Sequence, residues 1–313
     1  MLNLLLILFT ILTPQEIERR TAIDFNKQLS DLLPYIQKYY PDVDSTQIAK
    51  WEKSKALEYT IIDGKKWYFR RADENLFRID PEAKALKTSI EGKERAGRDE
   101  VTKQHIKRVL SETGNKTTNN LYAKHNWEFD FKLYLTPQSG LKDGELIKVW
   151  LPMPQTNQRR QTDCAITRFN RNVEINTGAH SVAYMEGNYD AHDTTMFNIV
   201  YNFTTYAEYN PLPKCFKHKK ADANNPKLKQ YLTERAPHCL FTDKVKALAD
   251  SIVGKEKRPY YQARKLFVAI RELYPWAGAC EYSIIPNIPE YVIDNRHGDC
   301  GQVTLLYIAM CRY

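Results

Sequence analysis

The sequence has 313 residues, a formal net charge of +8, and 42% hydrophobic and 12% aromatic residues. This length is enough for two or three domains, and the composition excludes a chain that is disordered on a large scale. The excess positive charge is scattered. Its densest stretch, residues 214–230, contains proline, asparagine and aspartate and almost no aromatic residues, so we predict a solvated linker and no nucleic-acid partner.

Residues 1–13 are predicted to be a signal-peptide-like segment. The run MLNLLLILFTIL has the length of the hydrophobic region of a signal peptide and is too short to span a bilayer as a helix. No basic residue precedes it and no clean cleavage site follows it, which leaves a buried N-terminal helix as the alternative. We expect a secreted or periplasmic protein with no membrane span in the mature chain.

Residues 14–120 are predicted to form a small N-terminal α/β region. Two alternating runs within residues 57–71 flank Asp63-Gly64, the strongest short-range signal for a β-hairpin. Helix-like stretches lie near residues 15–40 and 81–111. The polar stretch at 112–120 predicts a linker and therefore a domain boundary.

Residues 121–212 are predicted to form an antiparallel β-sandwich-like domain. Apolar and polar side chains alternate over 129–135, 147–151 and 197–203, and turn residues separate these runs. The histidines and the cysteine of this region are too far apart in sequence to indicate a metal site. Because no Asp-rich calcium loop appears either, we predict no metal and no cofactor.

A basic linker over 213–239 leads into a region, 240–313, with helical periodicity. Apolar residues spaced by three and four positions predict amphipathic helices near 245–252 and 259–274. Pro259 suits the first turn of the second helix, and Pro275 ends it.

The segment HGDCGQVTLLYIAM, residues 297–310, contains the start of another helix. Asp299 and Gln302 have the spacing of a capping box, which makes Cys300 the first helical residue. The free N–H groups and the dipole at a helix start favour a thiolate and could also stabilise an oxyanion. We expect Gly298 and Gly301 to leave room beside the sulfur, and the apolar helix that follows to be buried.

The structural alternatives for Cys300 are a small buried side chain or one half of a disulfide. Cys311 cannot be its partner, because eleven residues of helix span about 16 Å, whereas disulfide-linked Cα atoms lie within about 7 Å. The even number of cysteines keeps a structural disulfide protein open as an alternative. The six are Cys164, Cys215, Cys239, Cys280, Cys300 and Cys311.

The segment RHGDCGQVTLLYIAMCR resembles the nucleophile segment of the transglutaminase-like superfamily. In that superfamily a Gly-x-Cys elbow opens the central helix and an arginine closes it, which corresponds here to Gly298, Cys300 and Arg312. Residues 274–301 are similar to secreted bacterial members, and LIKVWLPMPQ, residues 146–155, resembles the sheet that precedes their core.

This resemblance implies an α+β protein in which the sandwich-like domain precedes the helical half of a papain-like or transglutaminase-like core. It implies a thiol acyltransferase or peptidase that acts on protein or peptide amides, with Cys300 as the nucleophile and its own N–H as an oxyanion donor. Trp276 and Tyr282 are candidates to line the pocket, with core packing as the alternative.

In this superfamily a histidine and an aspartate follow the cysteine helix, whereas this sequence stops at Tyr313. The resemblance therefore implies an incomplete catalytic core and little turnover. His297 is the nearby histidine, and we expect it to be a polar surface residue, with a role as base as the alternative. A non-catalytic secreted module that binds protein or glycan is the main alternative function.

Overall fold

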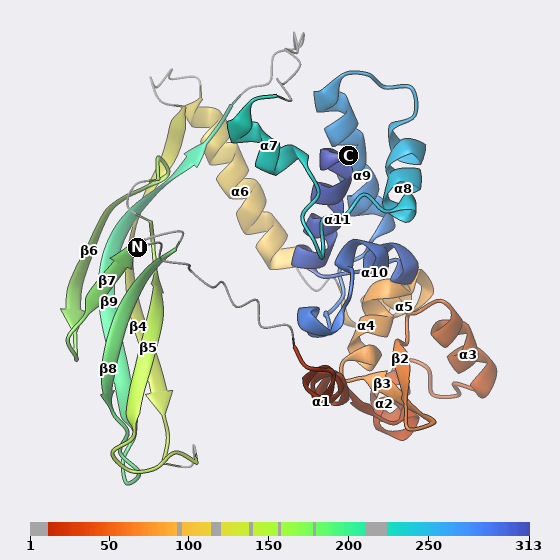
Figure 1. Ribbon diagram of the computed structural model, residues 1–313, viewed down its shortest axis with the longest axis horizontal. Helices are drawn as coiled ribbons and strands as arrows, with labels where there is room; N and C mark the ends of the chain where they lie inside the picture. Colours follow the sequence, from red (N-terminus) through yellow and green to blue (C-terminus); the bar gives the residue numbers. More distant parts are fainter. Residues whose placement is uncertain are drawn as a thin grey trace, which may run out of the picture. The chain divides into compact units, whose positions relative to one another are not determined.

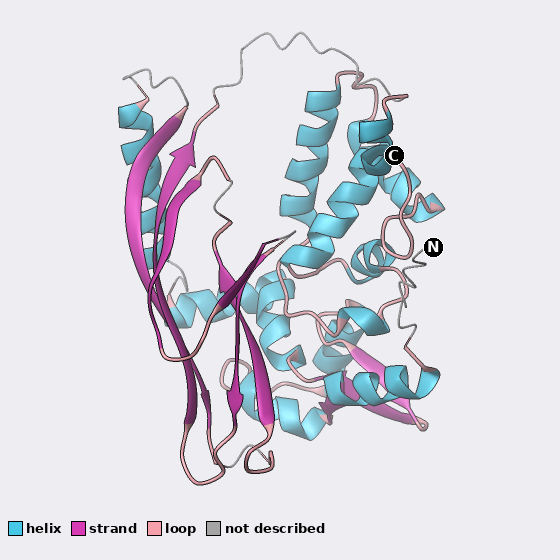
Figure 2. Cartoon of the chain, turned by 60° about the vertical axis from the view of Figure 1, so that its left-hand side comes forward, coloured by secondary structure: helices cyan, strands magenta, loops and turns pink. Residues whose placement is uncertain are grey.

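The computed structural model describes residues 12–92, 96–113, 120–137, 140–155, 158–177, 180–210 and 224–313. The fold class is α+β with antiparallel sheets, as predicted (Figure 2). Internal contacts divide the chain into two compact units. The first contains residues 12–92 and 224–313, and the second contains the described residues between 96 and 210.

The first unit is mostly helical, with one small antiparallel sheet of order β1-β3-β2 (Figure 1). Its elements are α1 (Pro14–Asp24), β1 (Phe25–Lys27), α2 (Leu29–Ile36), α3 (Ser45–Lys53), β2 (Tyr59–Ile62), β3 (Lys65–Phe69), α4 (Ala72–Ile79), α5 (Pro81–Glu91), α7 (Pro226–Leu232), α8 (Asp243–Val253), α9 (Pro259–Leu273), the 3₁₀ turn η1 (Tyr282–Ile284), α10 (Ile288–Asn295) and α11 (Cys300–Arg312).

The predicted hairpin and helices are present in this unit. Asp63 and Gly64 connect β2 to β3 with φ values of 51° and 72°, which is the left-handed pair that a two-residue hairpin turn requires. Helix α8 begins after the cap Thr242, and α9 begins with Pro259 in its first turn. The local signals at these positions therefore agree with the tertiary structure.

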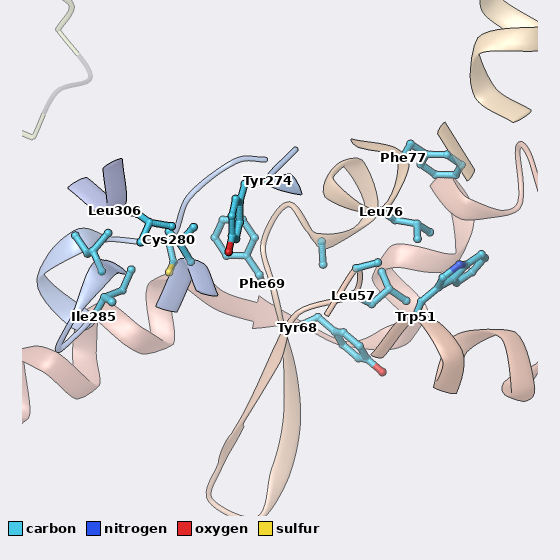
Figure 3. Packing of buried hydrophobic residues seen from close by; sticks show 14 of the residues in the cluster. Trp51, Leu57, Tyr68, Phe69, Leu76, Phe77, Tyr274, Cys280, Ile285 and Leu306 are labelled. Carbon is cyan, nitrogen blue, oxygen red and sulfur yellow. The ribbon is translucent and has the colours of Figure 1, made fainter. Parts of the chain in front are cut away.

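A single hydrophobic core joins the two segments of the first unit. Phe69 and Leu76 from the N-terminal segment belong to the same cluster of buried side chains as Ile285 and Leu306 from the C-terminal segment (Figure 3). This grouping differs from the predicted division into separate regions at 14–120 and 240–313. The physical reason is that neither segment alone encloses these side chains.

The second unit is a β-sandwich of two three-stranded antiparallel sheets with orders β4-β9-β6 and β5-β8-β7. Residues from β5, β8 and β9, including Leu151, Met185 and Ile199, fill the space between the sheets. Phe129 in the edge strand β4 stays exposed. The elements of this unit are α6 (Ala96–Glu112), β4 (Leu121–Leu135), β5 (Leu146–Met153), β6 (Gln161–Phe169), β7 (Glu174–Thr177), β8 (Ser181–Asn188) and β9 (Thr195–Glu208).

Two elements differ from the predicted boundaries. Helix α6 lies within the predicted N-terminal region but packs on β4, where Val109 is buried with Tyr122 and Ala123. Helix α7 lies within the predicted basic linker. The predicted signal-like run, apart from residues 12 and 13, and the first part of that linker, 213–223, lie outside the described residues. Among the helices of the described residues, none has the length and apolar character that a membrane crossing needs.

Candidate active site

Helix α11 begins at Cys300 with a complete capping box. The Asp299 side chain accepts a hydrogen bond from the Gln302 N–H at 2.9 Å, and the Gln302 side chain accepts one from the Asp299 N–H at 3.1 Å. Cys300 is exposed at this helix start. Because the first N–H groups of a helix lack intrahelical acceptors and Asp299 binds only that of Gln302, the N–H groups of Cys300 and Gly301 and the positive end of the helix dipole lie at this end of the helix.

The remainder of α11 fixes the position of this start. The helix contacts α8, α9 and α10, and its side chains Leu306, Ala309 and Met310 are buried, whereas its other apolar side chains are half-buried. At the other end, Arg312 donates to the backbone carbonyls of Gln230 and Thr233 at 3.2 and 3.0 Å. Both ends of α11 are therefore anchored.

The loop 275–282 runs beside the helix start. The Ala277 N–H donates to the Gly298 carbonyl at 3.1 Å, and Trp276 forms a parallel bridge with Gly298. Gly278 is held by Asn75 of α4, whose amide oxygen accepts from the Gly278 N–H at 2.7 Å and whose amide nitrogen donates to the Gly278 carbonyl at 2.9 Å. The loop is thus fixed from two directions.

A cavity of about 470 Å³ lies between this loop and the N-terminal segment. Its lining includes both predicted pocket residues and Asp299. Trp276 is 44% exposed, and the Arg78 guanidinium lies 5.0 Å from the centre of its ring. The complete lining is Asp24, Arg70, Arg71, Trp276, Gly278, Ala279, Cys280, Glu281, Tyr282 and Asp299.

Tyr282 connects this cavity to the start of α11. Its hydroxyl donates to the Asp299 carboxylate. Burial and the hydrogen bond to Asp299 raise the pKa of Tyr282. Cys300 is not itself part of the lining, but the preceding residue, Asp299, and the tyrosine that donates to it both are.

The predicted role of the two glycines is wrong. A Cβ on Gly301 would overlap with the Tyr282 hydroxyl, and a Cβ on Gly298 would come within 3.1 to 3.2 Å of the Gln302 and Val292 side chains. The space beside these glycines is therefore already filled by protein. They permit close packing of the tyrosine and the cap rather than room for a substrate backbone.

The prediction that His297 is a polar surface residue is also wrong. It is 1% exposed, and its ring packs edge-on against Tyr291 with 6.3 Å between ring centres. Burial lowers the pKa of His297 to about 4, and among the described residues neither ring nitrogen has a hydrogen-bond partner. Within the described chain no hydrogen bond connects its ring to Cys300.

Three of the other described cysteines lie in environments that disfavour the thiolate. Burial raises the pKa of Cys280 to about 12, and burial also raises the pKa values of Cys164 and Cys311. Cys239 is buried. The five described cysteines are all free thiols, and Cys215 lies outside the described residues.

The sequence did not indicate the N-terminal contribution to this site. Asp24, Arg70 and Arg71 line the cavity, although they lie more than 200 residues before Cys300. No local pattern marks such a contact. Among the described residues, no group of three His, Cys, Asp or Glu side chains is placed to hold a metal ion.

Comparisons with known proteins give one structural similarity. No protein-family model and no curated protein matches the chain. A crystal structure from Cytophaga hutchinsonii, described as "a Putative Cysteine Protease", is similar with 14% sequence identity and a TM-score of 0.40. The match covers 62% of this chain and 64% of that chain, which is less than two thirds of its length.

We expect Asp299→Ala to lower the free energy of unfolding by about 1 to 2 kcal/mol, because the helix loses its cap and Tyr282 loses its acceptor. Chemical denaturation would measure this change. The matched control is Asp299→Asn, which keeps a capping oxygen and should stay within about 0.5 kcal/mol of the wild type. Equal losses in both variants would contradict this role of the cap.

We expect Gly301→Ala to destabilise the protein by about 1 to 3 kcal/mol, because the new methyl group must displace the Tyr282 hydroxyl. Gly97, in helix α6, is the matched control. A Cβ there meets nothing within 4 Å, so Gly97→Ala should stabilise its helix by about 0.5 to 1 kcal/mol. Thermal unfolding of both variants checks the pair, and a neutral Gly301→Ala would show that Tyr282 does not pack there.

Proposed function

We propose that this protein is a transglutaminase-like thiol acyltransferase or peptidase that acts on protein or peptide amides through Cys300. The observation that carries the proposal is an exposed cysteine at the first position of a capped, anchored helix, beside a cavity of about 470 Å³. The resemblance of residues 296–312 to the nucleophile segment of that superfamily supports the same assignment. We include in this proposal that the protein is exported, as predicted from its signal-peptide-like N-terminal segment.

In the proposed reaction the Cys300 sulfur attacks the carbonyl carbon of an amide. A C–S bond forms, the C–N bond breaks, and the proton of the thiol leaves on the amine. The thioester then passes its acyl group to an amine or to water, which restores the thiol. The N–H group of Cys300, at the start of the helix, would stabilise the negative oxygen of the tetrahedral intermediate.

His297 does not suit proton transfer in this reaction. A general base or acid works best with a pKa near the working pH, and burial holds the pKa of His297 at about 4. Its ring also faces Tyr291 in the interior. The described residues therefore favour thiol attack and oxyanion binding at Cys300 but leave the proton-transfer group of the reaction unassigned.

Limited labelling with iodoacetamide at neutral pH tests the proposal. We expect Cys300 to react first, since it is exposed at a helix start while burial disfavours the thiolates of Cys280 and Cys311. Peptide mapping would locate the label. Preferential labelling of Cys239 or Cys311 in the folded protein would overturn the proposal.

The second candidate function, a non-catalytic module that binds protein or glycan, is favoured by exposed aromatic side chains on the sandwich. Trp127 and Phe129 lie exposed along β4, and Phe129 stacks on Tyr201 with 5.8 Å between ring centres. Exposed rings of this kind suit apolar contacts with a partner. Two results together would favour this function. Cys300 would react no faster than the other cysteines, and Trp127→Ala would abolish ligand binding.

A further inference from the structure

Two arginines of the cavity keep hydrogen-bond donors that the protein does not use. The Arg70 side chain is 51% exposed, and its Nε lies 3.1 Å from Asp24 Oδ1. The Arg71 side chain is 42% exposed, and its Nε and Nη2 both donate to one oxygen of Glu74, at 3.2 and 2.7 Å. Within the described part of the chain, the other two nitrogens of Arg70 and Nη1 of Arg71 have no acceptor.

The acidic residues of the same cavity are already engaged. The Asp24 side chain is 4% exposed, and its oxygens are taken by Arg70 and by the Glu281 N–H. The Glu281 carboxylate accepts from Ser283 at 2.8 Å and from Arg20 at 3.2 Å. Asp299 caps α11 and accepts from the Tyr282 hydroxyl, as described above.

This distribution determines which chemistry the cavity can recognise. Three carboxylates against two guanidinium groups give no net positive charge in the lining, so the cavity does not attract anions from a distance. Recognition would instead come from short-range hydrogen bonds. The unused guanidinium N–H groups can donate to both oxygens of a carboxylate. A carboxamide offers only one oxygen acceptor, so it cannot accept both hydrogen bonds.

We propose that Arg70 and Arg71 form a carboxylate-binding subsite beside Cys300, and that the acyl donor is a peptide with a carboxylate close to the carbonyl that the sulfur attacks. This inference rests on the proposed function, since it assigns a substrate class to the same site. Trp276, whose ring centre lies 5.0 Å from the Arg78 guanidinium, lines the same cavity. Its planar ring suits contact with a planar peptide group.

Two matched alkylating probes test the subsite without any need for turnover. N-bromoacetyl-glutamic acid α-amide and N-bromoacetyl-glutamine α-amide differ only in carboxylate against carboxamide, and each reaches roughly 8 Å from its reactive carbon. The Cys300 sulfur displaces bromide and forms a C–S bond with either probe. The ratio of the two rates at Cys300, found by peptide mapping, is compared with the ratio for N-acetylcysteine amide.

We expect the acid-to-amide rate ratio at Cys300 to exceed that of the model thiol by about tenfold or more, which is the lower end of the effect of one hydrogen bond to a charged group. Arg71→Gln should bring the ratio back to the model value. Arg70→Lys keeps the positive charge beside buried Asp24 but removes the planar guanidinium group with its paired N–H donors. It should therefore lower the ratio as well. Arg264→Gln, an exposed position of α9 outside the cavity lining, is the matched control and should leave it unchanged.

The outcomes separate this inference from the proposed function. If iodoacetamide fails to label Cys300 preferentially, the proposed function is wrong. The assignment of a substrate subsite, which rests on that function, is then wrong as well. If iodoacetamide labels Cys300 but the ratio equals that of the model thiol, the carboxylate subsite is wrong while the proposed function stands. A raised ratio that persists in Arg71→Gln and Arg70→Lys, with both variants folded by circular dichroism, would also overturn the assignment to these residues.

Discussion

Replacement of Asn75 by alanine is expected to lower the free energy of unfolding of the first unit by about 3 kcal/mol or more. Asn75 is 1% exposed and makes two hydrogen bonds to the backbone of Gly278. Alanine would leave a buried N–H and a buried C=O without partners, and each such group costs about 1 to 3 kcal/mol. Urea denaturation followed by far-UV circular dichroism measures the loss.

The same substitution should disturb the candidate site, because Gly278 lies in the loop that carries Trp276 and Tyr282. Quenching of Trp276 fluorescence by acrylamide should therefore change in Asn75→Ala. Asn26→Ala is the matched control, since Asn26 is exposed and donates one bond to the Ile23 carbonyl; it should cost less than about 1 kcal/mol. Similar losses in the two variants would show that the buried pairing with Gly278 does not form.

The stability of the first unit is expected to fall by about 3 kcal/mol, through His297 alone, as the pH drops from about 6.5 to about 4. The folded pKa of His297 lies below its ordinary value of 6.5, so the unfolded chain binds more protons between these two values. The stability contributed by the neutral histidine is therefore complete above pH 6.5 and lost as the pH falls through about 4.

Glu58 acts in the opposite direction. Burial raises its pKa, so its contribution is present at low pH and is lost as the pH rises through the folded value. The test is therefore the difference in unfolding free energy between wild type and His297→Gln, measured from pH 7 to pH 4, in which the effect of Glu58 cancels. A difference that stays constant over this range would mean that His297 is solvated in the folded protein.

Local features of the first unit could be predicted from sequence because each has a local physical cause. The hairpin follows from two residues that tolerate positive φ, Asp63 and Gly64, between alternating runs. The start of α11 follows from the reciprocal bonds that Asp299 and Gln302 make over three residues. Such signals need no knowledge of the rest of the chain.

The assembly of the candidate site could not be predicted in this way. Asn75 and Gly278 are 203 residues apart, and nothing in the local pattern around either residue marks the other. The burial of His297, whose ring packs edge-on against Tyr291, likewise depends on the tertiary fold and has no mark in the local sequence. Long-range packing therefore decides which residues of the N-terminal segment line the cavity, whereas Trp276 and Tyr282, which lie close to Cys300 in the sequence, could be predicted.

Acetylation by 4-nitrophenyl acetate tests most directly whether Cys300 is a nucleophile. Attack forms a thioester C–S bond and releases nitrophenolate, a weak base that needs no proton, so the result does not depend on a general acid. Intact mass and peptide mapping should show one acetyl group, on Cys300, removable by hydroxylamine. It should be absent in Cys300→Ala and retained in Cys311→Ala, the matched exposed cysteine. Acetylation that favours Cys311 or Cys239, or that persists unchanged in Cys300→Ala, would contradict the assignment of Cys300 as the nucleophile.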